Sequence, residues 1–296
     1  MAVPKFDHPT VYDGSKGTYL APELTKIGKD PSDLVEWLNL LAPDAVARCH
    51  RAYIDTGSEV IETNTFNGNR FRLAKYGLAD KVREVNLTAA RIAREVAGAD
   101  VSVAGVIGPS GKMLIMGEVT PEELREAFAE QAKALEEGGA DFLHLETMAD
   151  INEAVAAVEG ARSVVKLPIA VTLTFDTGKP EAGLRTMMGV TPAQLVAKGD
   201  EMGLLAVGSN CGLGLVGYQT LFQQFIDAKP RAAVIAKVNA GVPTFSEGMT
   251  VYEGTPEGMA EYAVWVAGIG VKLIGTCCGG GPEHIEAIAN ALAKLR

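Results

Sequence analysis

The sequence predicts an α/β fold, a (β/α)8 TIM barrel built as a single domain over residues 1–296. Three observations lead to this prediction. Short β-rich apolar runs alternate with helix-like segments about eight times, which is the pattern of a closed parallel barrel. Polar residues and glycines gather directly after the runs, where barrel enzymes place their active sites. The length of 296 residues is also ordinary for one barrel.

The expected strands are apolar runs, rich in β-branched residues, that end in polar or small residues. An open, doubly wound sheet is the alternative arrangement, but no G-x-G-x-x-G motif opens a helix after an early strand. The eight expected strands are Thr10–Asp13, Val60–Thr65, Val101–Ile107, Phe142–Glu146, Ile169–Phe175, Ala206–Asn210, Ala233–Asn239 and Lys272–Thr276.

The expected helices carry recognisable start and stop signals. Thr120, Thr191 and Thr255 each precede a proline, so the hydroxyl can cap the helix while proline occupies the first turn. Glycines at 138–139, 203 and 270 suit left-handed helix ends. The expected helices are Ala42–Thr56, Lys81–Ala97, Pro121–Glu137, Asp150–Val165, Pro192–Met202, Tyr218–Ala228, Pro256–Ile269 and Pro282–Leu295.

Composition excludes several classes of function. The chain is 47% hydrophobic with a net charge of −10, and it has neither a basic stripe for nucleic acid nor a Lys/Arg-rich amphipathic stretch for a membrane surface. No apolar run is long enough to span a bilayer, and Met1–Thr10 lacks the pattern of a secretory leader. We therefore expect a cytoplasmic protein that does not bind membranes or nucleic acid.

Three of the four cysteines follow predicted strands. Cys211 follows the sixth strand, and Cys277 and Cys278 follow the eighth, so their thiols can face one another across the barrel mouth if the backbone turns at the glycines after Cys278. Three thiolates suit one Zn²⁺ per chain, and no fourth protein ligand is evident, which leaves a position open for substrate. Packing in the core and redox activity of the adjacent pair are the alternatives. Cys49 lies within a predicted helix and is interpreted as a core residue.

Two acidic residues stand at predicted strand ends. Glu146 requires a cationic partner if it is buried, and a substrate ammonium group or a lysine or arginine of the barrel can serve. Asp13 and Gly14 offer a carboxylate and accessible backbone amides, although a simple turn explains the same pair.

Several segments resemble the homocysteine S-methyltransferase family. They are DGSKGT, IETNTFNGNRFRL, LETMADINEA, GSNCGLG, KVNAGVP and IGTCCGGGPEHI, in family order and over nearly the whole chain. The resemblance is strongest to the homocysteine-binding module of cobalamin-dependent methionine synthase, here as a stand-alone domain. Two departures stand near the expected pocket: Ser15-Lys16 replaces the Ala/Gly-Met of D-G-[AG]-M-G, and Val238 replaces the proline of PNAG.

The resemblance implies a zinc barrel whose ligands are Cys211, Cys277 and Cys278, which are therefore also the predicted catalytic residues. It implies a homocysteine site in which Glu146 holds the amino group. The predicted substrate-binding residues are Asp13, Gly14, Ser15, Thr63, Asn64, Glu146, Asn210 and Asn239.

The predicted reaction is methyl transfer to the thiol of homocysteine, giving methionine. A thiolate is the nucleophile, and zinc stabilises it. No D-x-H-x-x-G motif or folate-binding domain is present, so we expect the donor to be a separate methyl-corrinoid protein carrying methylcobalamin, with S-methylmethionine or betaine as small-molecule alternatives. A corrinoid-linked demethylase of another methylated substrate and a non-catalytic zinc- or thiol-sensing barrel are the other two hypotheses.

Overall fold

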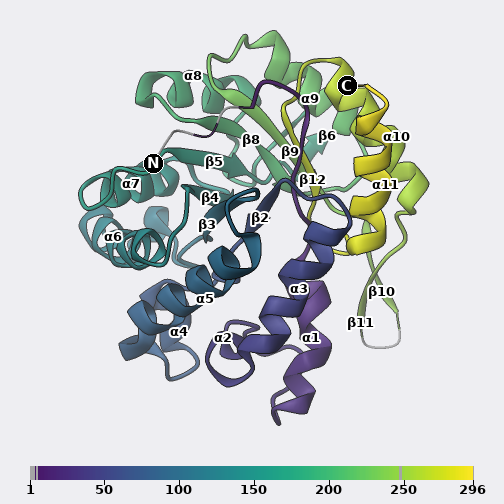
Figure 1. The fold of residues 1–296 in the computed structure, drawn as a ribbon. Coiled ribbons are helices and arrows are strands. Elements are labelled where there is room, and N and C mark those ends of the chain that lie inside the picture. The colour runs from purple at the N-terminus through teal and green to yellow at the C-terminus, as the bar shows by residue number, and fades with distance from the viewer. Residues whose placement is uncertain (1–3, 5, 247–248, 296) are drawn as a thin grey trace.

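Eight parallel strands curl into a barrel with helices outside it (Figure 1). The computed structural model describes residue 4, residues 6–246 and residues 249–295. Along the sheet the strands follow the order β1-β12-β9-β8-β5-β4-β3-β2. Their bounds are β1 Thr10–Val11, β2 Val60–Glu62, β3 Ser102–Ile107, β4 Phe142–Met148, β5 Ile169–Leu173, β8 Ala206–Cys211, β9 Ala233–Val238 and β12 Leu273–Thr276.

The two ends of this sheet meet, which distinguishes a barrel from an open sheet. Just after β1, Tyr12 forms a parallel bridge with Val60 of β2. The amide of Asp13 donates to the carbonyl of Val60 at 3.1 Å, and the amide of Glu59 donates to that of Val11 at 2.8 Å. The predicted (β/α)8 barrel is therefore confirmed, and the open-sheet alternative is wrong.

The eight predicted helices are present within a few residues of their expected ends. They are α3 Pro43–Asp55, α5 Val82–Ala97, α6 Pro121–Glu137, α7 Ile151–Arg162, α8 Pro192–Met202, α9 Tyr218–Asp227, α10 Pro256–Gly268 and α11 Pro282–Ala293. The predicted caps are also present, because Thr120, Thr191 and Thr255 each accept the amide three residues on.

The sequence prediction missed several short elements after strand ends. The most consequential is α1, Lys16–Lys26, which contains Gly17 and Pro22 and so lacks a helical sequence signature. The others are α2 Trp37–Leu41, α4 Arg70–Ala74 and two hairpins, β6 Thr177–Lys179 with β7 Gly183–Arg185 and β10 Pro243–Ser246 with β11 Met249–Tyr252.

The barrel interior is layered, since every second residue of a strand points inward. An apolar floor contains Tyr12, Val60, Ala104, Phe142, Ala170, Ala206, Ile235 and Leu273. Two residues further along four of these strands, the buried side chains are polar or charged: Glu62, His144, Thr172 and Lys237. Two residues further still, at the mouth, come Asn64, Glu146 and Asn239, and Asn210 occupies the same level on β8, four residues after Ala206. The fold therefore places a buried charged layer directly beneath the mouth.

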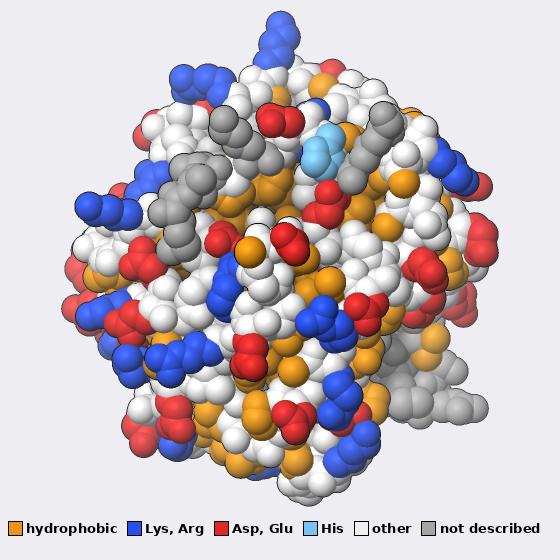
Figure 2. All heavy atoms as spheres, in the orientation of Figure 1, with side chains coloured by type: hydrophobic (Ala, Val, Ile, Leu, Met, Phe, Trp, Pro, Cys, Tyr) orange, Lys and Arg blue, Asp and Glu red, His pale blue; other side chains and the backbone are white. Residues whose placement is uncertain are grey.

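The outer surface is mixed in charge. On the face drawn in Figure 2, acidic and basic side chains are interspersed, in keeping with the absence of long runs of one charge in the sequence. None of the helices in the described part of the chain combines the length and the apolar character that crossing a bilayer requires.

Gly208 of β8 provides a test of the barrel packing. A Cβ at this position would lie 1.9 Å from the backbone oxygen of Ile235 on β9. We expect Gly208→Ala to lower the free energy of unfolding by about 1–3 kcal/mol through overpacking. Gly268→Ala is the matched control, because nothing lies within 4 Å of a Cβ there, and it should leave stability unchanged or raise it by up to ~1 kcal/mol. Urea denaturation checks both; equal stabilities of the two variants would contradict the described packing.

Candidate active site

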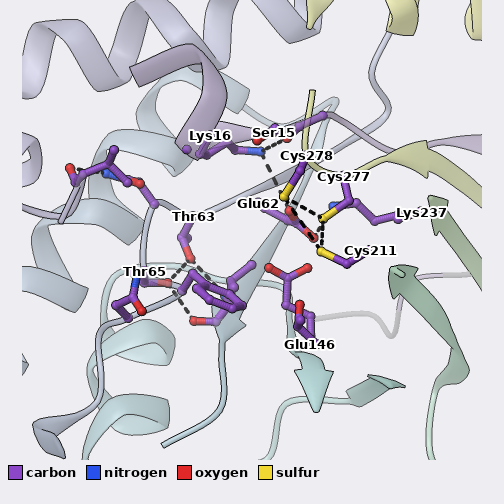
Figure 3. A pocket seen from close by; sticks show the side chains of 18 of the residues that line it. Ser15, Lys16, Glu62, Thr63, Thr65, Glu146, Cys211, Lys237, Cys277 and Cys278 are labelled. Atoms are coloured by element: carbon purple, nitrogen blue, oxygen red, sulfur yellow. Dashed lines mark hydrogen bonds and ion pairs between the residues drawn. The ribbon is translucent and has the colours of Figure 1, made fainter. Parts of the chain in front are cut away.

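Three cysteine sulfurs meet at the mouth of the barrel (Figure 3). Cys211 is the last residue of β8, and Cys277 and Cys278 follow β12, with β9 between the two strands. The Sγ of Cys211 lies 2.7 Å from that of Cys277 and 3.9 Å from that of Cys278. The Sγ atoms of Cys277 and Cys278 are 4.0 Å apart. The thiols thus form one cluster, hereafter the cysteine trio.

The backbone leaves strand geometry at both ends of this cluster. Cys211 has φ 58°, a left-handed conformation that costs a non-glycine residue about 1–2 kcal/mol. After Thr276 the chain turns, and Gly279 has φ 79°. A Cβ on Gly279 would also lie 2.3 Å from the Cβ of Tyr252, so a side chain would not fit there. The local strain at Cys211 is the kind that accumulates at functional sites.

Asn239 ties the two cysteine segments together. Its Nδ2 donates to the carbonyl of Gly212 at 3.0 Å, and its Oδ1 accepts the amide of Cys278 at 3.1 Å. One side chain at the end of β9 therefore fixes the separation of the segments that carry the trio.

The trio suits a zinc ion in its donor chemistry. With Zn–S bonds near ~2.3 Å, tetrahedral sulfurs lie about 3.8 Å apart, and the 3.9 and 4.0 Å distances agree with this spacing. The 2.7 Å pair is closer and would have to open. Among the described residues, no histidine, carboxylate or further cysteine joins the three sulfurs as a fourth ligand.

The closeness of the three thiols shifts their pKa values in opposite directions. Hydrogen bonds from Cys211 and Cys277 lower the pKa of Cys278 to about 3. The hydrogen bond with Cys211 and burial raise the pKa of Cys277 well above its usual value. The sulfurs by themselves stabilise one thiolate, so three thiolates together require a positive charge between them. Burial, followed by the charge of Cys278, raises the pKa of Tyr252 on β11, which places the phenol beside the cluster.

A cavity of about 170 Å³ opens beside the trio. Its wall includes Lys16, Glu62 and Lys237, and Asp13 lies buried behind them. The Lys16 ammonium pairs with Asp13 and lies 4.0 Å from Glu62, whereas the Lys237 ammonium pairs with Glu62 and lies 3.6 Å from Asp13. We call these four side chains the charge array; its two cations and two anions balance.

Glu62 and Lys237 hold their charges despite burial, whereas burial raises the pKa of Asp13 by more than the charge of Lys16 lowers it. Burial raises the pKa of Glu62, but Lys237, His144 and Lys16 outweigh it and keep that pKa well below its usual range. Burial likewise lowers the pKa of Lys237, and the carboxylates of Glu62 and Asp13 overcome it, so the pKa is raised. Paired and hydrogen-bonded charges of this kind are tolerated inside proteins, whereas single ones are costly.

Glu146 is the carboxylate that this array does not neutralise. It lies on β4 and lines the cavity, and in the described part of the chain no lysine, arginine or histidine forms an ion pair with it. Its hydrogen-bond donor is the Nδ2 of Asn210 at 3.3 Å. Burial, followed by the nearby charge of Glu62, raises the pKa of Glu146 to about 8. The cavity therefore contains one acid that lacks a cation.

Glu62, His144 and Glu146 also lie close enough to hold a metal. Glu62 is already paired with Lys237, and the Nε2 of His144 lies 3.0 Å from the hydroxyl of Thr172. Because a lysine ammonium occupies one carboxylate of this group, we assign no metal to it.

A sequence profile described as "Homocysteine S-methyltransferase" matches residues 10–292. The chain belongs to this family. It is 31% identical to methionine synthase of Mycobacterium leprae over 298 residues, which covers 96% of this chain and 24% of that protein. It is also 31% identical to methionine synthase of Mycobacterium tuberculosis over 300 residues, 97% of this chain and 25% of that protein. The chain thus spans about a quarter of the length of these relatives.

Solved structures show the same fold. The metallated form of the homocysteine methyltransferase MmuM from Escherichia coli superposes with a TM-score of 0.74 at 20% identity, covering 96% of both chains. A methyltransferase from Methanosarcina mazei superposes with a TM-score of 0.60 at 15% identity, covering 99% of this chain and 95% of that one. At these identities the likeness concerns the barrel alone.

In this member of the homocysteine S-methyltransferase family, the predicted site residues fall into two groups. One group lines the cavity: Gly14, Ser15, Thr63, Asn64, Glu146, Cys211, Cys277 and Cys278. The other group, Asp13, Asn210 and Asn239, is buried behind it. Asn210 braces Glu146 and also accepts the amide of Thr147 at 2.8 Å. Asp13 is paired with Lys16, and Ser15 caps α1 through Thr18.

Glu62, Lys237 and Lys16 are cavity residues that were not among the predicted site residues. Glu62 stands two residues before Asn64, and Lys237 two before Asn239, so strand alternation places each on the same inward face as its polar neighbour. That alternation is a signal through which both could have been found.

Proposed function

We propose that residues 1–296 form a zinc-dependent S-methyltransferase domain that transfers a methyl group to the thiol of homocysteine. The observation that carries the proposal is the convergence of three cysteine sulfurs beside a cavity whose wall contains one uncompensated carboxylate, Glu146. Family membership supports the same reaction.

Cys211, Cys277 and Cys278 would hold one zinc ion per chain. Zinc bound there supplies a positive charge that favours the thiolate form of a substrate sulfur at physiological pH. The protein's part is to keep its three ligands in place through Asn239 and the glycines that follow the cysteines. Since these thiols must stay reduced, a cytoplasmic location suits the site.

The remaining cavity residues would orient the amino acid. Glu146 accepts the substrate ammonium, which provides the cation that this carboxylate lacks. The segment Gly14–Ser15 and the strand end Thr63–Asn64 border the rest of the cavity. Asp13, Asn210 and Asn239 would act indirectly. Asp13 is paired with Lys16, Asn210 is bonded to Glu146, and Asn239 is bonded to both segments that carry the cysteine trio. Fixing the thiol in line with an incoming methyl group lowers the entropic part of the barrier.

A separate methyl-corrinoid protein is the donor that we favour. The support is the likeness to methionine synthases, of which this chain spans only about a quarter, so the remaining functions of those proteins belong to other segments.

Cys277→Ser tests the metal centre directly. We expect zinc to fall from one ion per chain to a small fraction, and methyl transfer to homocysteine to fall by at least ~100-fold, because a neutral hydroxyl replaces a thiolate ligand. Metal analysis of the purified protein and a methionine assay measure both quantities. Cys49→Ala is the control, since Cys49 is fully buried in the core away from the cavity; it should keep its zinc. Full activity of Cys277→Ser without metal would refute the proposal.

Glu146 predicts a pH dependence for recognition of the amino group. With a pKa of about 8 before substrate binds, the carboxyl is neutral at lower pH and cannot pair with an ammonium. The preference for L-homocysteine over γ-mercaptobutyrate, which lacks the amine, should therefore decline as the pH falls below about 8, by at most ~10-fold per unit. Calorimetry gives the dissociation constant of each thiol. Their ratio removes the pH dependence that both share through ionisation of the thiol group. In Glu146→Gln the preference for L-homocysteine over γ-mercaptobutyrate should be small and independent of pH. A wild-type preference that is also independent of pH would contradict the role of Glu146 in binding the ammonium.

A further inference from the structure

Lys16 and Lys237 occupy different positions in the charge array. Lys237 is 1% exposed, its ammonium lies 4.4 Å from the centroid of the Tyr12 ring, and it is paired with Glu62. Lys16 is 8% exposed and stands at the cavity wall as the first residue of α1. Both lysines line the cavity, and Lys16 is the more exposed of the two.

The ammonium of Lys16 has donor capacity left. It carries three N–H groups. Asp13 accepts one, and the carbonyl of Gly14, at 3.3 Å, accepts another. Glu62 is 4.0 Å away, beyond hydrogen-bonding distance. The ammonium also lies 5.2 Å from the centroid of the Tyr53 ring. Within the described ranges no further hydrogen-bond acceptor is bonded to Lys16, so one N–H remains for a ligand.

The backbone around Lys16 adds positive potential to the same wall. The first amides of a helix have no intrahelical acceptor, and the helix dipole is positive at this end. In α1 the Ser15 side chain accepts the amide of Thr18, and the segment from Gly14 to Gly17 borders the cavity. An anionic group placed there would meet the Lys16 ammonium and the start of α1 together.

Glu146 lies on the other side of the trio. In Figure 3, Lys16 stands above the three sulfurs and Glu146 below them. The cavity therefore presents, beside the trio, a cation with a free donor and a carboxylate without a cation. An α-amino acid carries the complementary pair of charges on one carbon atom.

We propose that Lys16 binds the carboxylate of the thiol substrate and so makes the site selective for zwitterionic α-amino thiols. This inference rests on the proposed function, in which a thiol binds at the cysteine trio. In this assignment Asp13 is the buried anion that positions Lys16, and Glu146 is the group that contacts the substrate ammonium.

The test compares three thiols on zinc-loaded protein by calorimetry: L-homocysteine, homocysteamine, which lacks the carboxylate, and γ-mercaptobutyrate, which lacks the amine. For the wild type we expect homocysteamine to bind about 10- to 100-fold more weakly than homocysteine, the usual effect of losing one charged hydrogen bond. Lys16→Met should weaken homocysteine by a similar factor and leave homocysteamine nearly unchanged. Glu146→Gln is the matched control and should remove the preference for the amine instead.

A purely structural role for Lys16 predicts another result. If Lys16→Met weakens all three thiols by the same factor, or leaves homocysteine binding unchanged, the inference is wrong while the proposed function stands. If the wild type binds none of the three thiols, the proposed function fails and the inference fails with it.

Should Lys16→Met fold poorly because Asp13 loses its partner, the double variant Asp13→Asn/Lys16→Met removes both charges and should show the same loss of selectivity for the carboxylate.

Discussion

The pairing of charges inside the barrel is the constraint on which the site depends. Two lysines and two carboxylates lie beneath the mouth, each within 4.0 Å of an opposite charge. Removing any one of them would leave a buried charge without its partner, at a cost of several kcal/mol. Glu146 has no cation of its own, and burial, followed by the nearby charge of Glu62, raises its pKa to about 8. In the proposed function, the substrate ammonium supplies the cation that Glu146 lacks.

Above the array, the site depends on where the strands end. Cys211 and the Cys277–Cys278 pair come from β8 and β12, which both neighbour β9 in the sheet, and Asn239 at the end of β9 bonds to both segments. The left-handed backbone at Cys211 is unfavourable by itself and is maintained by the ladder below it, in which Cys211 pairs with Val238. A rigid parallel barrel thus holds three sulfurs in positions that a flexible loop would not maintain.

Much of this arrangement could be predicted from the sequence, because its signals are local. Each predicted strand ends in a polar residue or is followed directly by a polar residue or glycine. The barrel, its order and the meeting of the cysteines therefore follow from the alternation of apolar runs. Helix α1 could not be predicted in this way, since Gly17 and Pro22 conceal it. The pairing of Lys237 with Glu62 joins β9 to β2, which are not neighbours in the sheet, and depends on the register of the whole barrel. Lys16 was visible as a departure from the family pattern, but its pairing with Asp13 required the fold.

If zinc at the cysteine trio activates the substrate, a thiol must lose its proton when it binds there. Zinc-loaded wild-type protein would be titrated with L-homocysteine in buffers of different ionisation enthalpy, so that calorimetry counts the protons released. We expect one zinc per chain and the release of between one and two protons per homocysteine at neutral pH: one from the thiol, which binds as a thiolate, and up to one from Glu146, whose pKa of about 8 must fall when it pairs with the substrate ammonium. Binding with no proton release, or equal binding after zinc has been removed under reducing conditions, would contradict this expectation.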